Sequence, residues 1–186
     1  EVVERGVVLA GGSAGAIVAF ESGHSDSGDP ESFYQKGEVD HSWEYVRVPG
    51  LNFLPGLCCP HYDKVQSNGI LRAIDFNDML KRHAGERGIG IDHWAALSIE
   101  GEKYQVISPN GKEGSVLEDG TFSEAREGRA GVWILDCEQE NVIRTLVPST
   151  GNIIDLLKPA TAVVEDARIE AIRKQNPGNV VIETIE

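Results

Sequence analysis

The apolar residues near the start of the chain form short runs separated by glycines and polar clusters. Residues 6–10 are an apolar run that ends at two glycines, which is typical of a buried strand in a parallel sheet. The helix-forming apolar residues 14–20 follow at once and predict a helix. Residues 21–42 are rich in Ser, Gly, Asp and His and show no periodicity, which predicts a long surface loop of the kind that often carries function.

The next part of the chain predicts strands around one amphipathic helix. Residues 43–48 alternate between apolar and polar side chains as a strand does, and residues 51–59 form a further apolar stretch. Residues 68–84 place apolar side chains at helical spacing. Gly85 then follows as a plausible helix stop.

The second half of the chain predicts antiparallel strand pairs and a final helix. The two predicted pairs are residues 95–99 with 104–107, around Gly101, and residues 132–137 with 142–147. Residues 163–174 have the spacing of an amphipathic helix, and residues 180–185 predict an edge strand. This order of elements favours an α/β sheet with antiparallel hairpin additions at one side.

Composition and charge narrow the class of protein. The chain has 186 residues without a repeat or a linker, so we expect one domain, and 40% hydrophobic with 25% charged residues is typical of a soluble globular protein. No run approaches the roughly 18 apolar residues of a membrane helix. The net charge of -13 repels phosphate backbones. We therefore expect neither a membrane nor a nucleic-acid partner.

Cysteine usage and acidic spacing argue against disulfides and metals. The chain has three cysteines: Cys58, Cys59 and Cys137. They form neither a disulfide framework nor a zinc-binding pattern, which predicts a reducing, cytoplasmic compartment. The aspartates between residues 63 and 78 are explained by a solvated helix face. We therefore expect no metal and no cofactor.

A candidate nucleophile lies between the first predicted strand and helix. Residues 11–15 match the pattern G-x-S-x-G, which on a sharp strand-to-helix turn presents the hydroxyl of Ser13 above the sheet. Small neighbours such as Gly12 suit the crowded turn, and the N–H of Ala14 is a candidate oxyanion donor. The alternative is a phosphate-binding or merely tight turn. A phosphate loop would carry a lysine after the last glycine, and none is present.

A serine nucleophile needs a base, and histidine is the usual one. The chain has five histidines: His24, His41, His61, His83 and His93. His61 follows an apolar run where the chain leaves the core, which is a favourable position for a base. His83 is explained as a helix cap and His93 as a core residue, while His24 and His41 lie in the predicted loop.

Several segments carry a family resemblance. They are residues 12–16, 21–27, 51–63 and 90–97, and the most discriminating is Pro60-His61-Tyr62-Asp63 after a Leu-Pro-Gly turn. In this order they resemble the peptidase E family, serine peptidases that include the α-aspartyl dipeptidases and are related to the cyanophycinases. The resemblance runs from about residue 6 to about residue 110.

The resemblance implies a flavodoxin-like sheet related to class I glutamine amidotransferases. It also implies a catalytic triad in which Ser13 is the nucleophile and His61 the general base. Asp26 fits the carboxylate that family members carry after the nucleophile helix, and Asp92 is the alternative third member. The implied function is a serine exopeptidase of the dipeptidase type that cleaves short peptides through an acyl-enzyme. Segment 21–35 contains no Arg or Lys, so strict α-aspartyl specificity is not predicted.

Two other functional hypotheses remain open. A degenerate homologue would keep the triad but act as a binding or structural subunit. An α/β-hydrolase esterase fits less well, because its sheet needs strands before the serine and its histidine usually comes last. Family members carry a longer segment before the serine. We therefore expect residues 1–186 to be one domain that corresponds to the C-terminal portion of a longer one, accompanied by a separate N-terminal half or by a second copy in a homo-oligomer.

Overall fold

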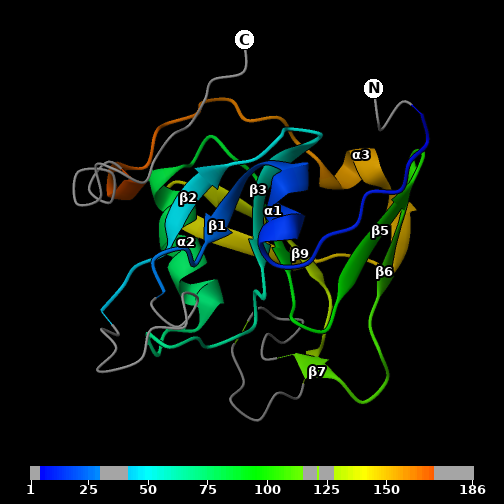
Figure 1. Cartoon of the computed structure of the whole chain (residues 1–186), viewed down its shortest axis with the longest axis horizontal. Coiled ribbons are helices and arrows are strands. Elements are labelled where there is room, and N and C mark those ends of the chain that lie inside the picture. The colour runs from blue at the N-terminus through cyan, green and yellow to red at the C-terminus, as the bar shows by residue number, and fades with distance from the viewer. Residues whose placement is uncertain (1–4, 30–41, 115–120, 122–127, 170–186) are drawn as a thin grey trace.

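The computed structural model describes residues 5–29, 42–114, 121 and 128–169, and within them a six-stranded sheet forms the centre (Figure 1). Its strands are β1 (Phe20–Ser25), β2 (Val46–Pro49), β3 (Leu54–Pro60), β4 (Gly88–Ile91), β9 (Val132–Glu138) and β10 (Asn141–Leu146). They lie in the order β10-β9-β4-β3-β1-β2. Strands β4, β3 and β1 are mutually parallel, whereas β2 at one side and β9 with β10 at the other run antiparallel to their neighbours. The predicted α/β sheet with antiparallel additions is therefore confirmed.

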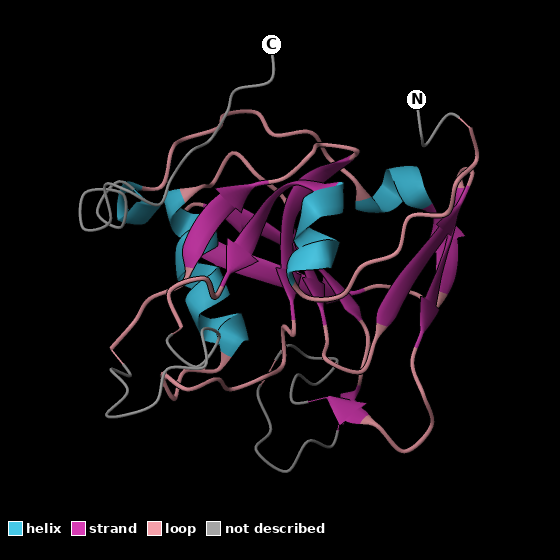
Figure 2. Cartoon of the chain, in the orientation of Figure 1, coloured by secondary structure: helices cyan, strands magenta, loops and turns pink. Residues whose placement is uncertain are grey.

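The helix α2 (Arg72–Arg82) connects β3 to β4 and covers one face of the sheet (Figure 2). Its buried side chains Phe76 and Met79 pack against Leu57 and Cys59 of β3 in one core cluster. A strand–helix–strand crossover of this kind is how parallel neighbours are joined. The predicted helix over residues 68–84 is confirmed, although its first regular turn starts at Arg72.

The helix α1 (Ala14–Ala19) packs on the opposite face of the sheet. Cys58, which alternates with its neighbours along β3, points to this side and joins a second core cluster against which Ala16 and Ala19 pack. The contact is close, because a Cβ on Gly23 of β1 would lie 2.6 Å from a side-chain carbon of Ile17. Burial on both faces explains why the middle of β3 is apolar throughout.

A second, antiparallel sheet completes the core on the side of α1. It consists of β5 (Ala96–Glu100), β6 (Lys103–Ile107) and β11 (Thr150–Asn152), and α3 (Ile153–Leu156) follows directly. A small pair, β7 (Glu113–Gly114) and β8 (Gly128–Arg129), lies beyond it. Both predicted antiparallel pairs, β5 with β6 and β9 with β10, are confirmed. None of the helices within the described residues combines the length and apolarity needed to cross a bilayer.

Two predictions near the start of the chain were wrong. Residues 7–10 form no strand, and Val7, Val8 and Leu9 are 53–87% exposed. An apolar run becomes a strand only where a neighbouring strand satisfies its backbone, and no described strand pairs with it. The predicted loop over residues 21–42 instead begins with the buried strand β1. Residues 30–41, with His41, lie outside the described residues.

The predicted C-terminal helix over residues 163–174 starts later than expected. Residues 163–166 are not helical and residues 167–169 are, while residues 170–174 and the predicted strand 180–185 lie outside the described residues. Asp166 sets the start, because its side chain accepts the N–H of Arg168 at 3.0 Å, as an N-cap residue does. Its other carboxylate oxygen accepts the N–H of Arg47 at 2.8 Å and fixes this segment to β2.

Candidate active site

The candidate site lies at the edge of the sheet where the parallel strands end. Asp26 follows β1, His61 follows β3, and Asp92 and His93 follow β4, so all four leave the sheet at the same edge. In open α/β sheets this carboxyl edge is where ligands usually bind. The structure therefore brings to one edge residues that are up to 67 positions apart in the chain, from Asp26 to His93.

The helix α1 presents Ser13 at this same edge. The carboxyl end of α1 lies at the opposite edge, because the N–H of Leu51, which precedes β3, donates to the carbonyl of Val18 at 2.9 Å. Since α1 packs on β1 and leads directly into it from the opposite edge, the first residue of α1 points to the edge at which β1 ends. Ser13 is partly exposed there and makes no side-chain capping bond.

The backbone at Ser13 has the strain expected of an exposed nucleophile. Its φ of 53° and ψ of -121° lie in a region that non-glycine residues rarely adopt. Gly11 permits the turn, because a Cβ at that position would clash with the backbone of Gly15. The first N–H groups of a helix have no partner four residues back in the helix. Here the N–H of Gly15 already donates to the carbonyl of Gly12 at 2.9 Å, so the N–H of Ala14 is the candidate oxyanion donor of this turn.

His61 is held just outside the sheet by a turn of its own. Its φ is 51°, and the next residue, Tyr62, donates its N–H to the carbonyl of Ile91 at 3.0 Å. The imidazole is half-buried, and its Nδ1 lies 2.8 Å from Nδ1 of His93. In this structure no hydrogen bond joins His61 to Ser13, both of which are described residues.

The surroundings of His61 keep it neutral. Burial lowers its pKa to about 4, and the positive charges of Arg72 and Lys64 and the neighbouring His93 act in the same direction. The carboxylate of Asp26 opposes them. An imidazole with this pKa carries a free lone pair at neutral pH and is able to accept a proton.

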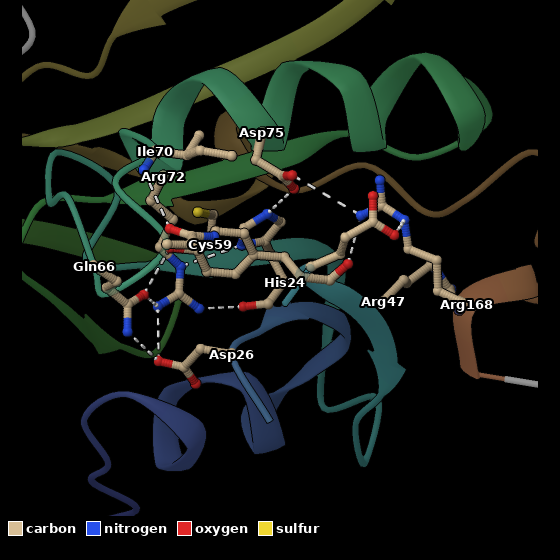
Figure 3. Close-up of polar contacts among 12 residues, drawn as sticks. His24, Asp26, Arg47, Cys59, Gln66, Ile70, Arg72, Asp75 and Arg168 are labelled. Carbon is tan, nitrogen blue, oxygen red and sulfur yellow. Dashed lines mark hydrogen bonds and ion pairs between the residues drawn. The ribbon is translucent and has the colours of Figure 1, made fainter. Parts of the chain in front are cut away.

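Asp26 lies near His61 but is bound by other groups. Its Oδ2 accepts a hydrogen bond from Gln66 Nε2 at 2.7 Å and forms an ion pair with Arg72 Nη1 at 3.3 Å (Figure 3). Burial favours the protonated acid, but the charge of Arg72 and the hydrogen bond from Gln66 outweigh it and hold the pKa of Asp26 below its ordinary value. The site therefore contains a fixed negative charge that acts on His61 without touching it.

Asp92, the alternative third member, is placed differently. Its side chain is buried, and its Oδ2 accepts the N–H of Gly131 at 2.8 Å and the indole N–H of Trp133 at 3.1 Å. These contacts tie the end of β4 to β9. Neither contact involves His61, whose Nδ1 instead lies within hydrogen-bonding distance of the next residue, His93.

Sequence reasoning missed Arg72, which organises the buried side of the site. This side chain is fully buried, donates to the carbonyl oxygen of His24 and to His24 Nδ1 at 3.2 Å, and also donates to Gln66 at 2.9 Å. Its guanidinium carbon lies 5.0 Å from the centre of the Tyr45 ring. One signal could have identified it, because Arg72 lies one helical turn before Phe76 on the apolar face of α2.

The site thus combines a serine on a strained turn with a histidine that follows β3, both at the carboxyl edge of the parallel strands in a mixed α/β sheet. The chain belongs to peptidase family S51, whose family model matches residues 1–107. This confirms the resemblance to the peptidase E family, and the mixed central sheet agrees with the flavodoxin-like fold of that family. The matched region includes Ser13, Asp26, His61 and Asp92.

Two curated relatives extend this comparison. A protein of Trypanosoma brucei brucei named G2/mitotic-specific cyclin-1 is 35% identical over 184 residues, which cover 89% of this chain and 52% of that protein. The uncharacterized peptidase YgaJ of Bacillus subtilis (strain 168) is 32% identical over 109 residues, which cover 58% of this chain and 40% of that protein. The chain thus spans about half the length, or less, of these curated relatives.

Proposed function

We propose that this chain is a serine peptidase that cleaves short peptides, as a dipeptidase does, with Ser13 as nucleophile and His61 as general base. The observation that carries the proposal is the shared sheet edge, where a strained turn presents Ser13 and a neutral imidazole follows the neighbouring strand. Membership of peptidase family S51 supports it at the level of the class of enzyme.

The proposed reaction has two steps, the formation of an acyl-enzyme on Ser13 and its hydrolysis, and His61 transfers protons in both. The Ser13 Oγ forms a bond to the peptide carbonyl carbon while its proton moves to His61 Nε2, and the N–H of Ala14 stabilises the oxyanion. His61 then gives this proton to the leaving amine, which leaves an acyl-enzyme on Ser13. Water, deprotonated by the same histidine, releases the acid product.

The proposal requires the side chains of Ser13 and His61 to come within hydrogen-bonding distance when a peptide is bound. Catalytic hydrogen bonds are often long or absent in free enzymes and tighten in the substrate complex. Ser13 is partly exposed and makes no capping bond, so its hydroxyl is free to rotate. Asp26, as the third member, would stabilise the imidazolium of His61 through its charge.

Steady-state hydrolysis of a panel of dipeptides and longer peptides tests the proposal. We expect Ser13→Ala and His61→Ala each to lower kcat by about 10⁴–10⁶-fold, the effect of removing a triad member. Ser98→Ala is the matched control, since Ser98 is an exposed serine of β5 in the second sheet and should leave kcat unchanged. Turnover retained in Ser13→Ala, with contaminating peptidases excluded, contradicts the proposal.

A second candidate is a binding or structural subunit that has lost catalysis. The observation in its favour is that, within the described residues, His61 is hydrogen-bonded to His93 and not to Ser13, while Asp26 is bound by Gln66 and Arg72. Wild-type protein that cleaves none of the peptides and whose Ser13 resists serine-directed reagents would favour this function.

A further inference from the structure

The hydrogen-bond partner of the proposed base His61, on its Nδ1 side, is a second histidine. Nδ1 of His61 lies 2.8 Å from Nδ1 of His93, and among the described residues no carboxylate is hydrogen-bonded to the His61 ring. In a serine–histidine–aspartate triad this nitrogen donates to a carboxylate, which fixes the tautomer of the base. We propose that His93 is the positioning residue of His61, a role that rests on the proposed function.

The fold places these two rings side by side. Pro60 of β3 is paired with Ile91 of β4, so the residues that follow the two strands leave the sheet next to each other. The backbone N–H of His93 donates to Asp63 Oδ1 at 2.7 Å, which fixes its main chain to the turn after His61. The two ring centres lie 4.9 Å apart, and Trp94 packs edge-on against the ring of His93 at 4.7 Å. The contact is therefore anchored from both strands.

A short contact between two imidazole nitrogens leaves room for one proton between them. When His61 donates through Nδ1 to the lone pair of His93, its Nε2 is left unprotonated and able to accept the proton of Ser13. When His93 is the donor, His61 carries its proton on Nε2 and is unable to act as a base. The tautomer of His61 with its proton on Nδ1 is thus the active one. A lone pair on His93 Nδ1 favours this tautomer because it accepts that proton in a hydrogen bond.

Proton transfer balances with His93 in this role. The proton of Ser13 moves to His61 Nε2 as the new C–O bond forms, and the proton on His61 Nδ1 stays in the hydrogen bond to His93. The same Nε2 proton later leaves with the amine. A neutral imidazole orients the base but does not offset its positive charge as a carboxylate would. Of the charged groups that act on His61, Arg72 and Lys64 oppose that charge and Asp26 favours it.

Steady-state kinetics of three substitutions at His93 show whether this residue orients His61 through a hydrogen bond or only fills space beside it. We expect His93→Ala to lower kcat by about 10²-fold and to leave KM within about threefold, because an oriented base acts in the transition state. His93→Asp, which offers a carboxylate to Nδ1, should recover kcat to at least the wild-type value and raise the lower pKa of the kcat/KM profile. His93→Gln, which also offers an acceptor, should recover part of it.

His83→Ala is the matched control for the loss of an imidazole. His83 is a buried histidine at the end of α2, beside the segment that enters β4 and so at the opposite edge of the sheet. The His83→Ala variant should leave kcat unchanged, because this imidazole is far from the proposed site. Wild-type kcat in His93→Ala, a loss confined to KM, or an equal loss in His93→Asp at unchanged thermal stability each overturns the positioning role.

Nitrogen-15 NMR of the imidazoles gives a readout that does not depend on turnover. In the wild-type protein we expect His61 to be protonated on Nδ1, with a shift typical of a strong hydrogen bond, and to become a mixture of tautomers in His93→Ala. An unchanged His61 tautomer in His93→Ala overturns the proposal. If Ser13→Ala retained peptidase activity, the proposed function would fail, while these spectra would still decide whether the two histidines are paired.

Discussion

Two histidines of the sheet have the same lowered pKa but different surroundings. Burial lowers the pKa of both His24, near the end of β1, and His61, after β3, to about 4. His24 is fully buried, with Nε2 2.8 Å from Asp75 and Nδ1 accepting from Arg72 (Figure 3). Its ring also stacks on that of Tyr45, with 4.3 Å between the ring centres. His61 is half-buried, and among the described residues only Nδ1 has a hydrogen-bond partner.

The comparison separates a structural histidine from a candidate catalytic one. A lowered pKa reports burial in both cases, so it does not identify a base. What differs is the backbone and the free nitrogen: His24 lies in a strand ladder opposite Arg47, whereas His61 has a φ of 51° just beyond a strand end. Functional side chains commonly lie on such connecting segments, which a rigid sheet positions.

The largest effect should separate the two histidines directly. We expect His61→Gln to lower kcat by about 10⁴-fold or more, with little change in the free energy of unfolding, because the ring is half-exposed. We expect His24→Gln to lower the free energy of unfolding while the folded protein keeps most of its kcat. Peptide hydrolysis and urea unfolding of both variants check this. A large loss of kcat in His24→Gln, or a large loss of stability with retained kcat in His61→Gln, would contradict the distinction.

Removing Arg72 should have the next largest effect, on stability. Arg72→Met leaves Asp26 without its ion pair and the carbonyl of His24 without its donor, and breaking a buried pair typically costs about 3–5 kcal/mol. Arg82→Met, at an exposed position in the last turn of α2, should change the free energy of unfolding by less than about 0.5 kcal/mol. Equal stability of the two variants in urea unfolding would rule out a structural role for Arg72.

The buried His24 should also make stability depend on pH. The pKa of His24 is lowered from 6.5, its ordinary value in an unfolded chain, to about 4 in the folded protein. Below about pH 6.5 the unfolded chain therefore takes up a proton that the folded chain does not. Stability therefore falls as the pH drops from about 6.5 towards 4. The contribution between about pH 7 and about pH 5 is about 2 kcal/mol. Urea unfolding should show a smaller pH dependence in His24→Gln, and an unchanged one would contradict the burial of this imidazole.

A smaller effect tests whether packing positions Ser13 relative to His61. Gly23→Ala places a methyl group against Ile17 and forces α1 away from β1, and such overpacking typically costs about 1–3 kcal/mol. Gly15→Ala on the same helix meets no atom within 4 Å and should not destabilise the protein. A Gly23→Ala variant as stable as Gly15→Ala would show that α1 does not rest on β1 as described.

Local patterns predicted much of this molecule. The helical spacing of residues 68–84 and the strand pairs around β5 and β9 are local signals, and the structure contains all of them. The motif around His61 also indicated that this residue lies where the chain leaves the sheet, whereas the strand expected before Ser13 is not formed. Such signals depend on neighbours in the chain, which the sequence displays directly.

What escaped prediction depends on partners far away in the chain. Ser22 and His24 make β1 look like a polar loop, but Ser22 donates to Glu86 at 2.7 Å and His24 contacts Asp75. The pairing of His61 with His93, rather than with the acidic Asp92, arises from the register of β3 and β4. Burial of polar groups is allowed where they are paired, and that pairing is invisible to local periodicity.

The reactivity of Ser13 towards a fluorophosphonate tests the central claim most directly. The account predicts one covalent adduct, located on Ser13 by peptide mass spectrometry and absent in Ser13→Ala. It also predicts that His61→Ala slows its formation by at least about 10²-fold, because a serine hydroxyl is a weak nucleophile without its base. No adduct on Ser13 in folded protein, or labelling at the same rate without the imidazole of His61, would contradict the account.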